Sequence, residues 1–543
     1  MGEDVHRLAI ACDNDERLER RVRPFAGLVR EDQRGYPVII QAGSVYVTRG
    51  SDRRSTGTHY TPRSLTEPIV RYALEPLCYE GPAEGRPREA WRLHPAGKLL
   101  TLKVCDMAMG SGAFLVETCR YLAARLLEAW EEAARQHPEA AGITPEGAVS
   151  TGALDERLIP KDTEERLALA RRLVADRCLY GVDKNAMAVE MAKLSLWLIT
   201  LQKDRPFTFL DHALRWGDSL LGVSNPEQIQ WFHLDPRAGR QPPLWSAVCA
   251  GALNTAVEKR RRLESFPVEE IRDAEEKARL LAEADLALAS VKVIGDLVVG
   301  AGLATAGRRG KALDSALDEI APILADAFDE RQSVDERALR LSSLRERARG
   351  MLGGGTTAER VPFHWPVEFP EVLSIPESHR RGFDAIVGNP PFLGGQRITG
   401  ILGTDYRNTL VAHLAHGQRG SADLCAYFFL RARQLLREGG TAGMLATNTI
   451  AQGDTREVGL EQLAADGCAI VRAVPSRKWP GTANLEVAQV WIRRGSWAGE
   501  HVLDDRPVQG ITPFLNPPGG VSGKPYRLAA NANKSFQGSI VLG

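Results

Sequence analysis

Two short stretches of this sequence combine residue types that could bind a ligand and act on it. The first, residues 106–112, reads Asp-Met-Ala-Met-Gly-Ser-Gly and follows an apolar run. Gly110 and Gly112 would let the backbone turn tightly and a ligand approach closely, and the start of a following helix would expose free N–H groups. Leu115 stands where a dinucleotide fingerprint has its third glycine. A ligand with a carboxylate tail therefore fits this loop better than a pyrophosphate.

The second stretch is Asn389-Pro390-Pro391-Phe392, which follows the apolar run 383–387. Two adjacent prolines after a strand fix a stiff, extended loop. Alone, this tetrapeptide would be interpreted as a rigid turn with a surface phenylalanine. Downstream of a strand and a glycine-rich loop, it indicates part of a functional site.

Two acidic residues follow further predicted strands. Asp183 ends the run 178–183, where a carboxylate could accept hydrogen bonds from ribose hydroxyls. Asp218 lies within 216–220, and we expect it to be an exposed acid after a third strand. Taken alone, the 106–112 loop is also compatible with an ordinary turn, and these acids favour the ligand site.

Strands and helices alternate around these stretches. The pattern predicts strands at 102–106 and 178–183, each followed by a helix, at 113–135 and 186–201. This order is typical of an α/β fold whose parallel sheet is built from right-handed crossovers. Further strand-like runs occur later in the chain, at 383–387, 442–446 and 487–492.

Between the first and the second group of predicted strands, the sequence pattern is that of helices. Residues 268–290 and 312–349 show helical periodicity, and the apolar window 289–306 contains Lys292 and Asp296, which favours a buried helix over a membrane span. We expect an α/β domain that is interrupted and resumed. Its predicted parts are an N-terminal extension (1–55), a first half (56–243), a helical insertion (244–365), a second half (366–500) and a C-terminal segment (501–543).

Composition excludes several classes of protein. The 543 residues include 69 Lys and Arg against 69 Asp and Glu, so the chain is not a uniformly basic nucleic-acid binder. Its eight cysteines are scattered without a Cys-x-x-Cys pair, which argues against a disulfide framework or a zinc cluster. Residues 1–21 are charged and lack the apolar core of a signal peptide, so we expect a reducing cytoplasm.

Together these motifs resemble the S-adenosylmethionine-dependent N6-adenine DNA methyltransferases with the gamma motif order. The 106–112 loop is similar to their motif I and Asn-Pro-Pro-Phe at 389–392 to motif IV, while His-Tyr-Thr-Pro at 59–62 resembles motif X. Asp183 and Asp218 stand where motifs II and III have their acids. The resemblance implies a Rossmann-like class I methyltransferase fold, with double-stranded DNA as partner and no metal.

The resemblance also implies residue roles. Asn389 and Pro390 would accept the two N6 hydrogens of adenine, and Phe392 would stack on the flipped base. Pro391 completes the catalytic set. The residues implied to bind S-adenosylmethionine are Tyr60, Thr61, Asp106, Met107, Gly110, Ser111, Gly112, Phe114, Asp183 and Asp218.

A narrower group is indicated further along the chain. Residues 419–424, 446–456 and 479–483 resemble the methylase portions of single-chain type II restriction–modification enzymes and of DISARM phage-defence methylases. This implies modification of host DNA in a bacterial or archaeal cell, with other defence subunits as further candidate partners. Such proteins carry a target-recognition domain after the catalytic region, and the strand-like run 535–542 resembles the entrance to one. Since 55 residues are too few for a nuclease, we expect modification without cleavage.

Two alternatives stay open. Protein-glutamine methyltransferases also use an Asn-Pro-Pro loop, although they usually carry tyrosine where this chain has Phe392. A DNA-recognition subunit with a vestigial site is the other alternative.

Several charged residues have ordinary interpretations as well. The basic run 259–262 is expected to be a solvated helix face, and His413 and His416 to share a helix face without binding metal. Basic residues are in weak excess over acidic ones in 366–543, and the sequence leaves open whether arginines of this region contact DNA phosphates. The candidates are Arg397, Arg407, Arg419 and Arg456.

Overall fold

The computed structural model resolves the chain into two compact units, Met1–Thr56 and Gly57–Gly543. In the smaller unit, Asp15 caps the second helix by accepting from the N–H groups of Arg17 and Leu18. Its elements are α1 (Gly2–Ala11), α2 (Glu16–Val22) and the 3-10 turn η1 (Arg23–Leu28). The structure describes residues 2–12, 14–29, 31, 36–39, 61–153, 156–202, 205–236, 242–243, 245–308, 310–329, 331–353, 360–375, 380–480 and 485–519.

A nine-stranded sheet forms the centre of the larger unit, in the order β11-β10-β8-β9-β7-β6-β3-β4-β5. The strands from β7 to β5 are parallel, whereas β9 runs antiparallel to both of its neighbours. This mostly parallel α/β sheet confirms the predicted fold class. The strands are β3 (Val104–Asp106), β4 (Leu179–Asp183), β5 (Leu214–Trp216), β6 (Phe383–Gly388), β7 (Leu436–Thr447), β8 (Cys468–Lys478), β9 (Glu486–Arg494), β10 (His501–Leu503) and β11 (Arg506–Val508).

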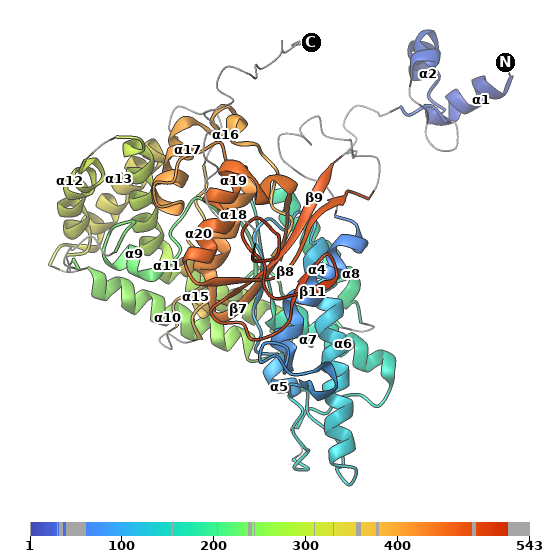
Figure 1. Cartoon of the computed structure of the whole chain (residues 1–543). Helices are drawn as coiled ribbons and strands as arrows, with labels where there is room; N and C mark the ends of the chain where they lie inside the picture. The colour runs from blue at the N-terminus through green and yellow to red at the C-terminus, as the bar shows by residue number, and fades with distance from the viewer. Residues whose placement is uncertain are drawn as a thin grey trace, which may run out of the picture. The chain divides into compact units, whose positions relative to one another are not determined.

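Side chains alternate between two apolar cores along the sheet, because successive residues of a strand point to opposite faces. In β3, Val104 packs into one core and Cys105 into the other. The first core includes helices visible beside β7 and β8 in Figure 1. These are α4 (Arg63–Cys78), α5 (Ala96–Leu99), α6 (Ala113–Gln136), α7 (Thr163–Arg177) and α8 (Ala186–Thr200). A small ribbon of β1 (Tyr79–Glu80) and β2 (Arg92–Leu93), with the turn η2 (Arg88–Ala90), follows α4.

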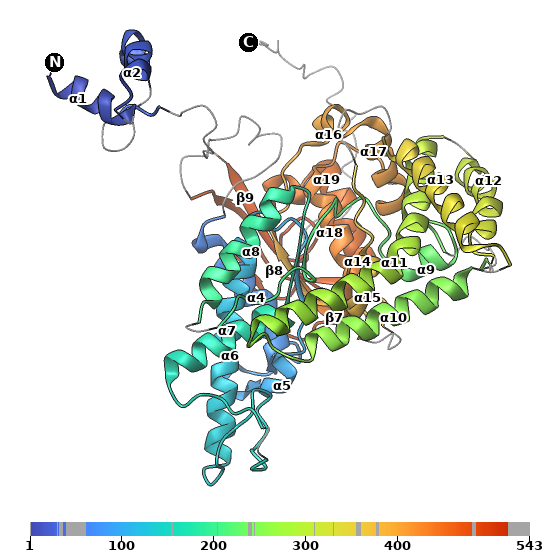
Figure 2. The same cartoon turned by 180° about the vertical axis from the view of Figure 1, so that it is seen from behind.

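The second core lies on the other face, where the helices α9 to α13 gather beside the sheet (left in Figure 1, right in Figure 2). They share this core with residues of the sheet and of α18. The helices of this face up to β6 are α9 (Pro226–Gln230), α10 (Ser246–Glu264), α11 (Ile271–Thr305), α12 (Ala312–Ala327), α13 (Val334–Gly353), α14 (Trp365–Glu368) and α15 (Pro370–Leu373). Those beyond β6 are α16 (Gly395–Leu402), α17 (Thr404–Thr409), the π-helix η4 (Leu410–Leu414), α18 (Leu424–Leu435), η5 (Asn448–Ala451), α19 (Gly453–Val458) and α20 (Leu460–Ala465).

The long helix α11 contains the apolar window that the sequence analysis interpreted as a buried helix. It is long and apolar enough to cross a membrane by length and composition, and 67% of its most apolar window is buried inside the protein. A capping box at Glu270 and Asp273 begins it. The predicted helix at 312–349 is instead broken into α12 and α13. The Asp329 carboxylate accepts from Arg331 N–H and the Ser333 hydroxyl from Glu336 N–H, which ends one helix and starts the next.

The order of the parallel strands determines where a ligand can bind. Reading outward, β3 is followed by β4 and β5 on one side, and by β6 and β7 on the other. In such doubly wound sheets the ligand crevice lies at the carboxyl ends of the strands, where the order reverses. Here that point lies between β3 and β6, which end at Asp106 and Gly388.

Candidate functional site

The loops that follow β3 and β6 meet at this switch point. The Asp106 side chain is buried, and a Cβ built on Gly388 would lie 2.7 Å from its Oδ1. Glycine at 388 therefore leaves room for the carboxyl group. Oδ1 accepts a hydrogen bond from Ala108 N–H (3.0 Å), whereas the buried Oδ2 has no partner among the described residues. Burial raises the pKa of Asp106 to about 8, and the nearby Asp183 adds to the rise.

The glycine-rich loop turns through two left-handed residues before α6. Gly110 has φ +54° and Gly112 has φ +85°. A Cβ on Gly112 would lie 3.2 Å from the Cβ of Ala192, so this glycine lets α6 begin against α8. A Cβ on Gly110 would meet nothing within 4 Å. The loop backbone, with the half-buried Ser111 beside it, therefore borders open space that a ligand could enter.

Asp183 at the end of β4 connects this loop to the next helix. Its Oδ2 accepts from Gly110 N–H (2.9 Å) and its Oδ1 from Asn185 N–H (2.8 Å). Burial raises the pKa of Asp183, although both hydrogen bonds oppose the rise. A carboxylate has about four acceptor positions, so two remain for the hydroxyls of a ligand. The side chain thus sits where the sequence analysis expects a ribose-binding acid.

Asp218 was expected to be exposed, and this was wrong: it is 6% exposed. Its carboxylate accepts from Lys184 Nζ (3.0 Å) and from the Tyr406 hydroxyl (2.9 and 3.1 Å). It also accepts from the N–H groups of Leu220 and Leu221, which closes the turn after β5. The physical reason for its burial is α17, which carries Tyr406 over the end of β5 from a position 188 residues away in sequence.

Asn389 holds an acceptor that the protein leaves open. Its Nδ2 donates to the Thr61 hydroxyl (3.2 Å), whereas its buried Oδ1 has no partner among the described residues. Pro390 is buried and Pro391 is half-buried. The contact with Thr61 joins the predicted motif X to the predicted motif IV. Tyr60 lies outside the described residues.

The loop after Asn389 is anchored on both sides. Phe392 is half-buried and packs against both apolar cores. Leu393 N–H donates to the Asp423 carboxylate (3.3 Å), and Leu424 N–H donates to the Leu393 carbonyl (2.9 Å). Asp423 also caps α18. Asp423 lies in the stretch 419–424, for which no role was predicted, and its local signal is an acid directly before a helix.

Two other predicted cofactor residues are parts of the core. Met107 is buried, and its carbonyl accepts from the Ser219 hydroxyl. Phe114 is buried on α6 in the first core. Their main chains still flank the glycine-rich loop, so the assignment of both to cofactor binding stays a prediction.

Two expectations for charged residues need correction. Arg260, within the basic run on α10, is buried and not solvated: it donates to the Glu368 carbonyl (2.7 Å) and pairs with Glu371 (3.5 Å). His416 follows the π-helix η4 with φ +49°, so it does not share a helix face with His413. Both differences arise from tertiary packing, which helical spacing alone cannot show.

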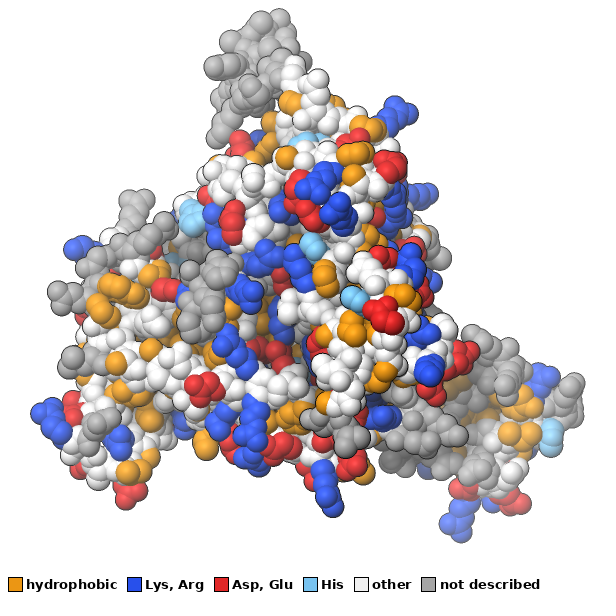
Figure 3. All heavy atoms as spheres, turned by 90° about the horizontal axis from the view of Figure 1, so that it is seen from below, with side chains coloured by type: hydrophobic (Ala, Val, Ile, Leu, Met, Phe, Trp, Pro, Cys, Tyr) orange, Lys and Arg blue, Asp and Glu red, His pale blue; other side chains and the backbone are white. Residues whose placement is uncertain are grey.

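The candidate DNA arginines differ in how accessible they are. Arg397 and Arg419 are exposed, whereas Arg456 is buried, pairs with Glu457 and Glu461, and lies over the Phe514 ring. Arg407 is half-buried and donates to the Gly420 carbonyl. Basic and acidic side chains are interspersed on the face shown in Figure 3. No group of His, Cys, Asp or Glu among the described residues could hold a metal ion.

The residues at the switch point fit S-adenosylmethionine. The unpartnered Oδ2 of Asp106 suits a cationic group, and the open space over Gly110 gives access to the loop backbone. The start of α6 presents N–H groups that suit a carboxylate tail. Asp183 retains acceptor positions for ribose hydroxyls.

Comparison with known proteins gives a family match. The model of the Eco57I restriction-modification methylase family matches residues 177–465, which is just over half of the chain. The matched region includes β4, β5, β6 and the Asn389 loop. No curated protein matches the chain at a significant level.

Solved structures show similarity at low identity. MmeI, a type IIL restriction-modification enzyme in complex with DNA, is 14% identical with a TM-score of 0.40, over 87% of this chain and 43% of that chain. The EcoKI M protein of a type I restriction enzyme is 9% identical with a TM-score of 0.25, over 75% and 44%. A putative class I S-adenosylmethionine-dependent methyltransferase from Listeria monocytogenes is 9% identical with a TM-score of 0.18, over 49% and 83%. This chain spans less than half the length of MmeI and of the EcoKI M protein.

Proposed function

This chain belongs to the Eco57I restriction-modification methylase family, and on that premise we propose that it methylates the N6 amino group of adenine in DNA. One observation carries the proposal: the buried Oδ1 of Asn389 lacks a protein donor while the Nδ2 of the same amide is held by Thr61. A buried acceptor without a partner is costly. An exocyclic amino group of a substrate base would supply the missing donor.

The chemistry follows from the weakness of this nucleophile. The lone pair of adenine N6 is delocalised into the ring, so the site must localise it on nitrogen. Asn389 Oδ1 accepts one N6 hydrogen and the Pro390 carbonyl accepts the other. When bound, S-adenosylmethionine supplies the methyl group, carried on a positively charged sulfur. Acceptors fixed in place by a stiff loop provide alignment and electrostatic stabilisation. Once N6 carries the methyl group it is positively charged and strongly acidic, so it releases one proton to water and no titrating base is needed.

The substrate base must leave the double helix to reach Asn389. Flipping a base costs a few kcal/mol, which stacking in the active site offsets. Phe392 is half-buried and packs against both apolar cores, which hold it in place. Its ring would stack on the flipped adenine. The Asp423 contact keeps the end of this loop in place.

The cofactor side is formed by the ends of β3, β4 and β5. Asp106 and the loop at Gly110 and Gly112 bind the methionine part, and Asp183 binds the ribose. We assign Asp218 to the adenine side of the cofactor, held in orientation by Tyr406 and Lys184. Thr61 orients the Asn389 amide, and Tyr60 would complete the methionine side.

We further propose that the substrate is double-stranded host DNA, methylated at specific sites as part of restriction–modification or phage defence. This would take place in the cytoplasm of a bacterial or archaeal cell. Other subunits of the defence system could supply sequence recognition.

Incubation with S-adenosylmethionine labelled in its methyl group tests the proposal directly. Plasmid DNA and a total protein extract are offered separately, and labelled DNA is digested to nucleosides. Label in N6-methyl-2′-deoxyadenosine is expected, and label in N4-methyl-2′-deoxycytidine or in protein glutamine would contradict it. A chain that binds the labelled cofactor yet transfers nothing would be a non-catalytic subunit.

A further inference from the structure

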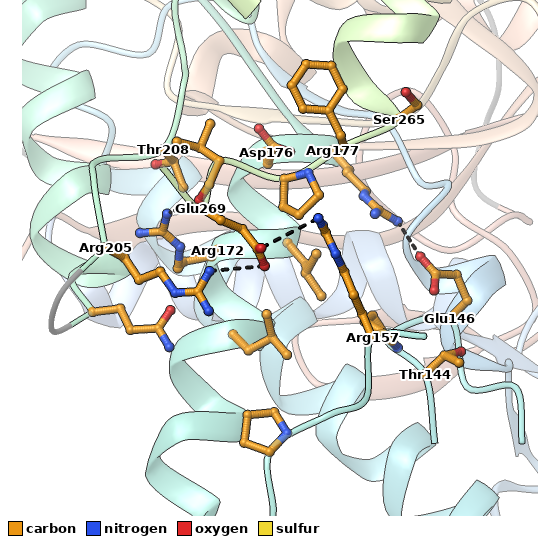
Figure 4. Close-up of a pocket in the computed structure, with 18 of the residues that line it drawn as sticks. Thr144, Glu146, Arg157, Arg172, Asp176, Arg177, Arg205, Thr208, Ser265 and Glu269 are labelled. Carbon is orange, nitrogen blue, oxygen red and sulfur yellow. Dashed lines mark hydrogen bonds and ion pairs between the residues drawn. The ribbon is translucent and has the colours of Figure 1, made fainter. Parts of the chain in front are cut away.

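A cavity lies at the opposite end of the sheet from Asn389. It has a volume of about 550 Å³ and is lined by one side of α7 and by residues from three other parts of the chain (Figure 4). These are residues 144–146, 157, 158, 160, 202, 205, 208 and 265–269. Its lining residues Asp176 and Arg177 directly precede β4, whose far end carries Asp183. The cavity therefore belongs to the amino ends of the strands and not to the proposed active site.

The charges around this cavity are unequal. Four arginines line it, at positions 157, 172, 177 and 205, against Glu146, Asp176 and Glu269. Arg177 pairs with Glu146 (3.0 Å), and Glu269 bridges Arg157 (3.5 Å) and Arg205 (3.0 Å), as Figure 4 shows. The buried Lys277 forms an ion pair with Asp176 (2.7 Å). Because Lys277, which lies outside the lining, occupies Asp176, two lining carboxylates remain for four arginines, so positive charge is in excess.

Arg172 carries the unmatched charge. It is 7% exposed, and its guanidinium donates to the Val268 carbonyl (2.9 Å). Among the described residues no carboxylate lies within ion-pair distance of Arg172. Burial lowers its pKa and the neighbouring Arg205 lowers it further, although the more distant Asp176 and Glu269 partly oppose this. Since a buried charge without a counter-ion is unfavourable, an anion entering the cavity would be stabilised there.

The remaining walls mix apolar and neutral polar side chains, the polar ones being Thr144, Gln202, Thr208 and Ser265. Phe266, Leu173 and Val268 line the cavity together with several prolines. A volume of this size falls within the range of small-molecule sites, which combine apolar walls with a few well-placed polar groups. Arginine forks match the geometry of phosphate oxygens. An anion with an attached apolar or planar part would use both kinds of surface.

We propose that this cavity binds a small phosphate monoester of about mononucleotide size, with its phosphate on Arg172 and Arg205 and its organic part against Phe266. Arg157 lies across the cavity with Glu269 between it and Arg205, and both arginines can turn toward the ligand. A DNA backbone is a poorer fit, because the cavity is remote from the loop that would act on a base. The site is independent of the proposed methyl transfer.

Titration calorimetry on the whole protein tests this site, with adenosine 5′-monophosphate and inorganic phosphate as probes. Arg172→Met should weaken binding of both roughly tenfold to hundredfold, the loss expected for one charge-assisted contact. Glu269→Gln should tighten binding several-fold, because it frees Arg157 and Arg205 from their internal counter-ion. Arg171→Met, on the same helix but outside the lining, is the matched control and should bind as the wild type does.

The two substitutions have opposite expected signs, so a general loss of folding cannot imitate both. Asp183→Ala distinguishes this cavity from the proposed cofactor site, to which adenosine 5′-monophosphate could also bind. Binding that survives Asp183→Ala and fails in Arg172→Met supports the proposal. No binding by the wild-type protein, or binding that depends on Asp183 and not on Arg172, would overturn it.

Discussion

The polar atoms at the switch point are of two kinds. Asp183 and Asp218 have their carboxylates occupied by hydrogen bonds from their own chain. Asn389 Oδ1 and Asp106 Oδ2 are buried without partners among the described residues. Buried groups that a fold leaves unsatisfied usually have a functional reason. Changes to the first kind should therefore affect both the folded structure and the cofactor binding proposed for these two acids, whereas changes to the second kind should act mainly on ligand binding or catalysis.

The sharpest case is Asn389. Replacement by alanine removes the open acceptor and leaves the cofactor side of the site unchanged. We expect methyl transfer to fall by about 10²–10³-fold or more, as it does when a preorganised hydrogen-bonding group is lost. Cofactor affinity measured by calorimetry should stay within about twofold. Thr61→Val, which only loosens the amide, should give a smaller loss of kcat, of about tenfold at most. Parallel loss of activity and cofactor affinity in Asn389→Ala would argue against this role.

Asp106 makes stability depend on pH. Its pKa is raised from 3.8 to about 8 in the folded protein by burial. Between these two values the unfolded chain releases the proton and the folded chain keeps it, so the contribution of Asp106 to stability falls as pH rises. The fall is about 1.4 kcal/mol per pH unit at most, and it ends above pH 8.

Asp106→Asn removes this titration. The difference in unfolding free energy between variant and wild type should therefore grow in favour of the variant from about pH 4 to pH 8. Urea unfolding at several pH values measures it, and other titrating groups cancel in the difference. A difference that does not change with pH would show that Asp106 is ionised in the folded protein.

Residue types predicted the motifs but not their partners. The glycines, the acids at strand ends and the Asn-Pro-Pro-Phe loop carry local signals, because each requires a particular backbone or position. Tyr406 and Thr61 reach their partners across 188 and 328 residues. Contacts over such separations depend on how the elements pack, which is why the burial of Asp218 was not foreseen.

At the scale of elements, strand ends were more predictable than whole strands. β3, β4 and β6 are short apolar runs that end at Asp106, Asp183 and Gly388, so their pattern is plain. β7 starts with Arg-Glu-Gly-Gly after Leu436, which resembles a turn. Leu436 pairs with Phe383 of β6, and the pairing resumes at Thr441 after an irregularity in register. β8, β10 and β11 were not predicted. Their charged residues obscure the alternation that marks a strand.

The element that joins the two halves of the site is α17. Its Tyr406 hydroxyl binds Asp218 at the end of β5, while α16 and α17 themselves follow the Asn389 loop. Tyr406→Phe should lower the free energy of unfolding by about 1.5–3 kcal/mol, since it removes a buried hydrogen bond to a charged group. Cofactor affinity should fall as well, because Asp218 loses one of the groups that orient it.

A matched control is Tyr79→Phe, whose hydroxyl donates to Glu128 at 3.4 Å in an exposed position. That change should cost less than about 0.5 kcal/mol. Equal stability of the two variants in urea unfolding would mean that α17 is held by apolar packing alone.

At the scale of the molecule, the helices between β5 and β6 belong to the same apolar core as the sheet. Leu288 and Ile294 of α11 share that core with Ile386 of β6 and Phe429 of α18. A helical insertion was predicted at 244–365. How much of the sheet its helices cover could not be predicted from the sequence pattern. They are therefore part of the scaffold that holds the Asn389 loop.

The whole chain has no net charge, with 69 basic and 69 acidic residues, so the proposed affinity for DNA must come from local groups. Arg397 and Arg419 are exposed and follow the Asn389 loop in sequence, whereas Arg456 is buried and forms ion pairs with Glu457 and Glu461. If the two exposed arginines contact phosphates, each should add roughly one unit to the slope of log affinity against log salt concentration.

Arg397→Ala combined with Arg419→Ala should therefore reduce that slope by about 2 and weaken binding similarly for all DNA sequences. The slope is measured by fluorescence anisotropy with a labelled duplex at several salt concentrations. Arg349→Ala, an equally exposed arginine on α13, is the control and should leave the slope unchanged. A slope that is the same in all three proteins would remove these arginines from the DNA interface. Because phosphate contacts position DNA without reading its sequence, any site preference should persist in the double variant, which separates recognition from attraction.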